Sequence, residues 1–207
     1  MTPEDVETLG RCMTVGGVAV FPADTVYGLA CQPESREAVE RLYALKGRRP
    51  DKPAAVMFFD LDLALAALPE LAPATRAALT RLLPGAVTAL LPNPAGRFPL
   101  AGAGDPATLG LRVPRREGAL APLAALRWPV LQSSANLAGG PDPVRLEDVP
   151  EEVRAGADLL LDAGPLPGTP STVVDLRRYA QTGEWSVPRP GAVPARALEE
   201  ALSSDGR

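Results

Sequence analysis

The chain has 207 residues, a formal net charge of -4 and a hydrophobic fraction of 46%. This length suits one domain that buries a core without disulfides or metals. The sequence contains no histidine, which excludes Ser-His-Asp and Cys-His catalysis, histidine-ligated zinc and imidazole acid–base chemistry. An acidic protein meets a polyanion through a local cationic cluster, so we expect a pocket rather than a basic surface stripe.

Apolar runs and helical patterns alternate along the first part of the chain. Short apolar runs bounded by Gly or Pro predict buried strands, and Ser35 and Gly47 have the residue types that begin and end a helix. In chain order we expect a helix at 3–13, a strand at 16–22, a polar loop at 23–34, a helix at 35–46 and a strand at 54–59.

The second part of the chain repeats this alternation. Continuous apolar strands with helices between them indicate an α/β or α+β protein with one sheet covered by helices. The further elements are helices at 60–67 and 74–83, strands at 84–92 and 108–114, a helix at 119–126, a strand at 128–134, a helix at 147–155, strands at 158–163 and 171–176, and a helix after 193.

The segment "LKGRRPDKP" concentrates four cations between a helix end and a strand, and it holds the only two lysines of the chain, Lys46 and Lys52. One interpretation is a solvated turn whose cations sit favourably at a helix C-terminus. The other is a polyphosphate clamp, since extended residues project alternate side chains on one face and Arg and Lys both bind phosphate oxygens. The segment alone leaves both open.

Other polar residues follow or interrupt apolar strands. Asp24, Thr25 and Tyr27 come after the first strand, where open α/β sheets place ligands. "QSSANLAGGPDP" has hydroxyls and an amide before a Gly-Gly turn. "STVVDL" and "VPRPGAV" likewise place polar side chains at the edge of an apolar strand. Arg112 lies inside an apolar strand, where burial of a cation demands an anionic partner.

The segment "GAGDPA" at 102–107 formally matches a dinucleotide-binding fingerprint. It follows no apolar strand, and Pro106 stands where a helix would have to open, so we reject that interpretation. A mobile Gly-rich loop that acts as a lid is the better prediction.

Seven segments together resemble the YrdC-like family, the L-threonylcarbamoyladenylate synthases: "FPADTVYGLA", "LKGRRPDKP", "PGAVT", "LRVP", "SSAN", "STVVDL" and "RPGAV". The resemblance covers residues 5–193 as one YrdC-like domain, with 194–207 as a C-terminal helix and tail of a short-form member. It implies a twisted mixed sheet flanked by helices around a large, positively lined cavity. It also implies the reaction, in which L-threonine, bicarbonate or CO2, and ATP give L-threonylcarbamoyl-AMP and pyrophosphate for a tRNA modification.

The resemblance also implies roles for individual residues. Lys46 and Arg48 would be catalytic, at the reacting carbamate and phosphates. The residues implied for ATP binding are Arg48, Lys52, Thr108, Ser134, Asn136, Asp142 and Arg189. Those implied for threonine binding are Thr25, Tyr27, Met57, Arg112 and Ser171, with Arg112 paired to the carboxylate. No residue is assigned to a metal, and Mg²⁺ is expected to accompany ATP.

The chain departs from the family pattern at three positions. Met57 stands where many relatives have histidine, so a polar contact to threonine is either lost or replaced. Ala23 and Ala138 occupy positions where relatives often have polar residues. These departures concern the amino-acid pocket and its selectivity.

Two alternative functions stay open on the sequence. The first is a tRNA- or double-stranded-RNA-binding module without catalysis, which the arginines at 112–116 and 177–178 favour and the acidic net charge disfavours. The second is a carbamoyl-adenylate enzyme of hydrogenase maturation, an activity that normally sits in a much larger chain of the same family.

The main interpretation carries expectations about partners and location. The expected partners are the three small substrates, the downstream tRNA threonylcarbamoyl transferase complex and weakly bound tRNA. The acidic N-terminus has no apolar core segment, and no run of about 18 apolar residues occurs. We therefore expect a cytoplasmic protein without a membrane segment.

Overall fold

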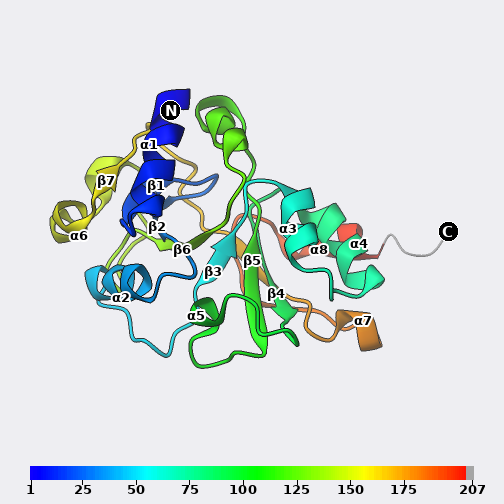
Figure 1. Cartoon of the computed structure of the whole chain (residues 1–207). Helices are drawn as coiled ribbons and strands as arrows, with labels where there is room; N and C mark the ends of the chain where they lie inside the picture. The colour runs from blue at the N-terminus through cyan, green and yellow to red at the C-terminus, as the bar shows by residue number, and fades with distance from the viewer. Residues whose placement is uncertain (204–207) are drawn as a thin grey trace.

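One nine-stranded sheet runs through the computed structural model, which describes residues 1–203 (Figure 1). The strand order is β7-β1-β2-β6-β3-β5-β4-β8-β9. The strands are β1 (Ala19–Pro22), β2 (Tyr27–Cys31), β3 (Ala55–Met57), β4 (Val87–Pro92), β5 (Thr108–Arg112), β6 (Val130–Ser134), β7 (Leu159–Leu160), β8 (Thr172–Asp175) and β9 (Ser186–Arg189).

The sheet is mixed, which confirms the predicted fold class. Parallel pairs join β1 to β7, β3 to β5 and β4 to β8. The remaining neighbours are antiparallel. The two central strands β3 and β5 are therefore parallel to each other but antiparallel to their outer neighbours β6 and β4.

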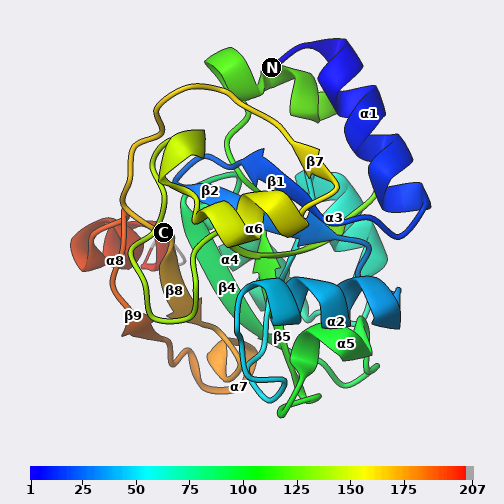
Figure 2. The same cartoon turned by 90° about the vertical axis from the view of Figure 1, so that its left-hand side faces the viewer.

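Helices flank the sheet, with α1, α2 and α6 grouped at one end and α3, α4 and α8 at the other (Figures 1 and 2). Their bounds are α1 (Pro3–Thr14), α2 (Arg36–Leu45), α3 (Leu61–Ala67), α4 (Pro73–Leu82), α5 (Pro99–Gly102), α6 (Glu151–Gly156), α7 (Tyr179–Thr182) and α8 (Ala195–Leu202), with 3-10 helices η1 (Gly118–Ala125) and η2 (Leu146–Asp148). No helix formed by residues 1–203 combines the length and hydrophobicity that a membrane crossing requires.

Local sequence signals explain where the first two helices begin and end. The hydroxyl of Thr2 accepts a hydrogen bond from the Asp5 amide, and the Asp5 carboxylate accepts one from the Thr2 amide, which forms a capping box. Ser35 caps α2 by accepting from the Ala38 amide, as predicted. Gly47 follows α2 with a φ of 58°, a conformation that favours glycine, so the predicted end of this helix is also confirmed.

Two apolar clusters lie on opposite faces of the sheet, because successive side chains of a strand alternate between faces. Val20 and Leu29 belong to the larger cluster, which also buries apolar side chains of α2, α4 and α8. Ala19 and Phe21 belong to the smaller one, which is covered by α1 and η1. The smaller cluster leaves part of its face without apolar cover, and the site described below occupies that part.

The prediction of a polar loop at 23–34 is wrong for its central part. Residues 27–31 form β2, a fully buried strand that pairs with β1 on one side and β6 on the other. Polar residues before and after this segment and the glycine within it concealed the strand. Glycine suits position 28, because a Cβ atom there would make tight contacts, 3.1 Å from the Ser133 carbonyl oxygen and 3.3 Å from the Phe21 ring.

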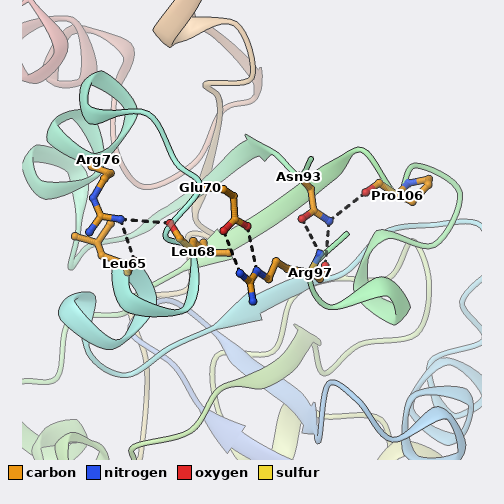
Figure 3. A network of polar contacts seen from close by, with 7 residues as sticks. All are labelled: Leu65, Leu68, Glu70, Arg76, Asn93, Arg97 and Pro106. Atoms are coloured by element: carbon orange, nitrogen blue, oxygen red, sulfur yellow. Dashed lines mark hydrogen bonds and ion pairs between the residues drawn. The ribbon is translucent and has the colours of Figure 1, made fainter. Parts of the chain in front are cut away.

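The segment that contains "GAGDPA" is anchored by a polar network (Figure 3). The Asn93 amide group donates to the carbonyl oxygens of Arg97 and Pro106, and Arg97 forms an ion pair with Glu70 at 3.1 Å. Asn93 thus joins the two ends of the loop that leads into β5. No helix opens within 103–107, which agrees with our rejection of a dinucleotide-binding motif. The predicted lid motion stays a prediction.

The C-terminal helix joins the main core. Leu198 and Leu202 of α8 are buried in the larger cluster, and α8 contacts α4. The helix that we expected after residue 193 is confirmed as α8. The domain boundary at 193 stays a prediction, and part of the predicted tail lies outside the described residues.

Gly191 lets two of the sequence motifs approach each other, and this gives a first prediction. A Cβ atom at position 191 would lie 2.4 Å from the Pro170 carbonyl oxygen and 2.6 Å from the Thr172 amide nitrogen. We expect Gly191→Ala to lower the free energy of unfolding by roughly 2 kcal/mol, because backbone atoms must move apart. Urea denaturation followed by circular dichroism measures this change.

Gly10 supplies the matched control. It lies within α1, and a Cβ atom there would be 3.7 Å from the Trp128 ring, an ordinary contact. Gly10→Ala should raise the free energy of unfolding by up to about 1 kcal/mol, because alanine favours the helix. Equal stability of the two variants would contradict the close approach at Gly191.

Candidate active site

The uncovered part of the sheet forms the floor of a cavity of about 300 Å³. Alternation along β5 explains its polarity: Leu109 and Leu111 enter the larger core, whereas Thr108, Gly110 and Arg112 line the cavity. The charged residues of the lining are Arg48, Arg112, Arg177, Arg189, Asp105 and Asp142. Four arginines against two aspartates make the wall positive, as the resemblance implied.

Arg112 is a buried cation on the cavity floor. Its NH2 group donates to Asp24 Oδ1 at 2.7 Å and to Thr25 Oγ1 at 3.3 Å, and its NH1 group lies 3.5 Å from Gln132 Oε1. Burial lowers the pKa of the guanidinium, and Asp24 opposes this shift. The Nε atom is buried and has no hydrogen-bond partner among residues 1–203. Asp24 is therefore the anionic partner that the sequence led us to expect. A guanidinium has five N–H donors, and the contacts of Arg112 do not use all of them.

Lys46 is buried behind the rim of the cavity, with an exposed fraction of 3%. Its Nζ donates to the carbonyl oxygens of Ser134 and Asn136, at 2.7 and 3.0 Å, and also contacts both side chains. Burial and the nearby Arg48 lower the pKa of Lys46 to about 8, whereas Asp142 favours its charged form. Lys46 thereby links the residues that follow β6, and its ammonium group loses its proton at a lower pH than that of an exposed lysine.

Arg48 lines the cavity and is held from two sides. Its NH2 group donates to the Pro53 carbonyl oxygen at 2.6 Å, and its guanidinium carbon lies 5.8 Å from the centroid of the Tyr43 ring. Tyr43 also fixes the following turn, because its hydroxyl donates to the Lys52 carbonyl oxygen at 2.7 Å. The Arg48 Nε atom is buried without a hydrogen-bond partner in the described part of the chain.

The far wall comes from the strands β4, β8 and β9. Ser171 and Thr88 share a hydrogen bond of 2.8 Å between their hydroxyls. Arg189 donates to the Ser171 carbonyl oxygen at 2.8 Å and lies 3.3 Å from its hydroxyl. Arg177 lies 3.3 Å from the Thr108 hydroxyl and pairs with Asp175. The wall therefore presents two guanidinium groups with neighbouring hydroxyls.

The structure brings most of the predicted site residues together. Those that line the cavity are Thr25, Arg48, Thr108, Arg112, Ser134, Asp142, Ser171 and Arg189. Lys46 and Asn136 contact this set through Ser134. The roles assigned to these residues by the resemblance stay predictions.

Besides Lys46 and Asn136, three further predicted residues do not line the cavity. The Tyr27 side chain enters the larger core, and its hydroxyl lies 2.6 Å from Asp162 Oδ1 and 2.8 Å from the Gly164 carbonyl oxygen. Met57 is fully buried in the smaller core cluster with Phe21. Lys52 is exposed on the turn outside the lining. The pairing register of a strand and the alternation of its side chains decide which face each residue occupies. A short sequence motif reveals neither the register nor the face.

Sequence reasoning missed several polar cavity residues, among them Asp105, Gln132 and Arg177. Gln132 lies within the strand that precedes "SSAN", and a polar side chain in an apolar strand is the same signal that pointed to Arg112. Arg177 follows "STVVDL" directly and was considered only as a surface cation. Its side chain reaches the cavity because Asp175 holds it by an ion pair of 2.5 Å.

The described side chains of the cavity do not form a metal site built from protein ligands alone. Within residues 1–203 no cluster of three or more Cys, Asp or Glu side chains has metal-binding geometry. The two lining carboxylates, Asp105 and Asp142, stand among four arginines.

These features define an α/β protein with a cationic cavity on one face of a mixed sheet. A family model described as "Telomere recombination", which covers the Sua5, YciO and YrdC proteins, matches residues 11–191. The chain belongs to this Sua5/YciO/YrdC family.

Individual relatives agree with that assignment. The chain is 35% identical over 191 residues to a threonylcarbamoyl-AMP synthase of Bacillus subtilis, covering 89% of this chain and 53% of the relative. It is 30% identical over 191 residues to a threonylcarbamoyl-AMP synthase of Pyrococcus abyssi, covering 90% of this chain and 54% of the relative. The chain thus spans about half the length of these curated relatives.

A solved structure gives the same match in three dimensions. The crystal structure of P. abyssi Sua5 complexed with L-threonine superimposes with a TM-score of 0.84 at 26% sequence identity. The match covers 97% of this chain and 58% of that chain.

The ion pair between Arg112 and Asp24 yields a second prediction. Both side chains are nearly buried, at 4% and 6% exposed. Asp24→Asn should lower the free energy of unfolding by about 3 kcal/mol, because it leaves a buried cation without its anion. The midpoint and slope of urea denaturation measure the loss.

The exposed pair of Arg49 and Asp51 is the control, with side chains 75% and 51% exposed. Asp51→Asn should cost less than about 1 kcal/mol, as surface pairs usually do. If Asp24→Asn is no more costly than Asp51→Asn, Arg112 does not depend on Asp24.

Proposed function

We propose that this protein forms L-threonylcarbamoyl-AMP and pyrophosphate from L-threonine, bicarbonate or CO2, and ATP. One observation carries the proposal: a single cavity joins the buried Arg112, with its unpaired Nε atom, to Arg48 and Arg189. Several anions must lie close together in this reaction, namely a carboxylate, a carbamate and a triphosphate. The family relationship and the names of the relatives support the same function.

The threonine carboxylate would bind Arg112, which orients the amino acid on the cavity floor. The free amine and CO2 form a carbamate, with loss of a proton from nitrogen. A carbamate oxygen then attacks the α-phosphorus of ATP, and the bond from that phosphorus to the oxygen bridging to the β-phosphorus breaks, so that pyrophosphate leaves. The protein contributes by positioning the reactants and by stabilising negative charge on the transferring group.

Lys46 and Arg48 would act at the reacting centre, and Arg189, Thr108 and Ser134 would hold the nucleotide. A compact ammonium suits the point of highest charge, and planar guanidinium groups suit paired phosphate oxygens. Mg²⁺ would arrive with the triphosphate and neutralise part of its charge. Asp142, which already favours the charged form of Lys46, lies on the same wall.

The alternatives have less support. An RNA-binding module does not require a buried guanidinium with an unpaired nitrogen, and the named relatives are synthases. The same relatives favour threonine chemistry over hydrogenase maturation. Transfer of the product to a tRNA threonylcarbamoyl transferase complex, weak tRNA binding and a cytoplasmic location stay predictions.

The direct test is pyrophosphate release with ATP, bicarbonate and each amino acid in turn. We expect release that depends on threonine, with threonylcarbamoyl-AMP detected by mass spectrometry. Lys46→Ala and Arg48→Ala should each lower turnover at least 100-fold (about 2.7 kcal/mol), because they remove charge stabilisation at the reacting centre. Arg49→Ala is the matched control, since this neighbour is exposed and pairs with Asp51.

Absence of threonine-dependent pyrophosphate release from the wild-type protein would refute the proposed function. Full turnover in both Lys46→Ala and Arg48→Ala would refute the assignment of the reacting centre. Loss of turnover in Arg49→Ala to the same extent would show that the whole turn, rather than its inward cations, is required.

The lowered pKa of Lys46 predicts how ATP binding depends on pH. Its pKa in the folded protein is about 8, below the ordinary lysine value of 10.5, so Lys46 loses its charge as the pH rises through about 8. ATP affinity, measured by calorimetry without threonine, should fall roughly tenfold between about pH 7 and pH 9.5, since one cation is lost. Lys46→Met should bind ATP more weakly than the wild type at pH 7, match it near pH 9.5 and lack this decline, and an equal decline in Lys46→Met would contradict the assignment.

A further inference from the structure

Gln132 is a buried amide on the cavity floor. It lies on the central strand β6, is only 6% exposed and lines the cavity. Its cross-strand neighbours are Ala30 on β2 and Ala55 on β3. Both neighbours are small, so the longer Gln132 side chain has room to extend across the floor towards Arg112.

Glycine on β2 provides the space for the amide end. A Cβ atom at position 28 would lie 3.1 Å from Gln132 Nε2, closer than an ordinary contact. The glycine therefore leaves room for the amide group beside β2. A Cβ atom at position 28 would require that group to shift by a few tenths of an ångström.

The Gln132 amide has bonding capacity that the protein does not use. A carboxamide has two donors and two acceptor sites. Within residues 1–203 its side chain makes one hydrogen bond, and that bond to Arg112 is 3.5 Å long. Buried polar groups normally find partners, so the unused donors point to a ligand in the cavity.

Nearby hydroxyls are already engaged. Thr25 Oγ1 accepts from Arg112, and the hydroxyls of Thr88 and Ser171 bond to each other at 2.8 Å. Met57, where the family resemblance led us to expect a polar contact to threonine or its replacement, is buried in the smaller core cluster. Gln132 lies beside Arg112, and the two N–H donors of its amide have no hydrogen-bond partner among residues 1–203.

We propose that Gln132 determines amino-acid selectivity by hydrogen bonding the side-chain hydroxyl of threonine, while Arg112 holds the carboxylate. The inference rests on the proposed function, because it assigns a role within the same site. It locates the polar contact that Met57 does not supply. Valine is the informative competitor, since it has nearly the shape of threonine and a methyl group in place of the hydroxyl.

The test compares threonine with valine in wild-type protein and in Gln132→Met. Methionine keeps the length of the side chain and removes both polar atoms. We expect the threonine-over-valine ratio of kcat/KM to fall tenfold or more through the KM for threonine, because one hydrogen bond is worth about a factor of ten. The KM for ATP should stay unchanged. Gln32→Met, the same substitution at an exposed glutamine outside the cavity, should leave all values unchanged.

A second variant, Gln132→Glu, tests the same inference if Gln132→Met does not fold. Gln132→Glu keeps the shape but brings a carboxylate beside Arg112, where it competes with the amino-acid carboxylate. We expect a rise of at least tenfold in the KM for threonine with little change in the KM for ATP. An unchanged threonine-over-valine ratio in Gln132→Met, or an unchanged threonine KM in Gln132→Glu, would overturn the inference.

Calorimetric titration separates this inference from the proposed function. Threonine and valine are titrated into wild-type protein and Gln132→Met, without ATP. A wild-type preference for threonine that Gln132→Met loses supports the inference even if no pyrophosphate is released, whereas a preference that it retains overturns it. Failure of pyrophosphate release in the wild type concerns the reaction and not this contact.

Discussion

The buried ion pair of Arg112 and Asp24 is the constraint on which the site depends. A guanidinium in the centre of a sheet is costly unless an anion accompanies it, and Asp24 supplies that anion at 2.7 Å. Asp24 follows β1, so the pair fixes the β1–β2 turn above the floor formed by β5. Asp24 occupies one edge of the guanidinium, and the buried Nε atom has no hydrogen-bond partner among residues 1–203.

The rest of the cavity follows from alternation along the strands. Strand β5 shows this most clearly, since Leu109 and Leu111 enter the larger core while Thr108, Gly110 and Arg112 line the cavity on the opposite face. Helices α1 and η1 cover one part of that face and leave the remainder open. The turn after α2 adds Arg48 to the cavity wall, where it donates to the Pro53 carbonyl oxygen. Lys46 donates to the Ser134 carbonyl oxygen and so holds the end of β6.

Local chemistry predicted the helix ends, most strands and the main cations. Ser35 and Gly47 mark α2 by capping rules, and Arg112 was recognisable as a cation in an apolar strand that required an anion. Which residues share the cavity depends on register between strands distant in sequence, which local patterns do not encode. Tyr27 and Met57 therefore lie outside the lining, and Gln132 and Arg177 were missed. Strand β2 was hidden for a similar reason, since its pairing with β6 joins residues about a hundred positions apart.

We expect a single cavity to hold both the amino acid and the nucleotide, between Arg112 and the Lys46–Arg48 turn. A crystal structure of the protein with threonine and a non-hydrolysable ATP analogue is the direct test. The threonine carboxylate should lie within hydrogen-bond distance of Arg112, and the phosphates should lie beside Arg48 and Arg189. Threonine bound away from Arg112, or phosphates bound outside this cavity, would contradict this expectation.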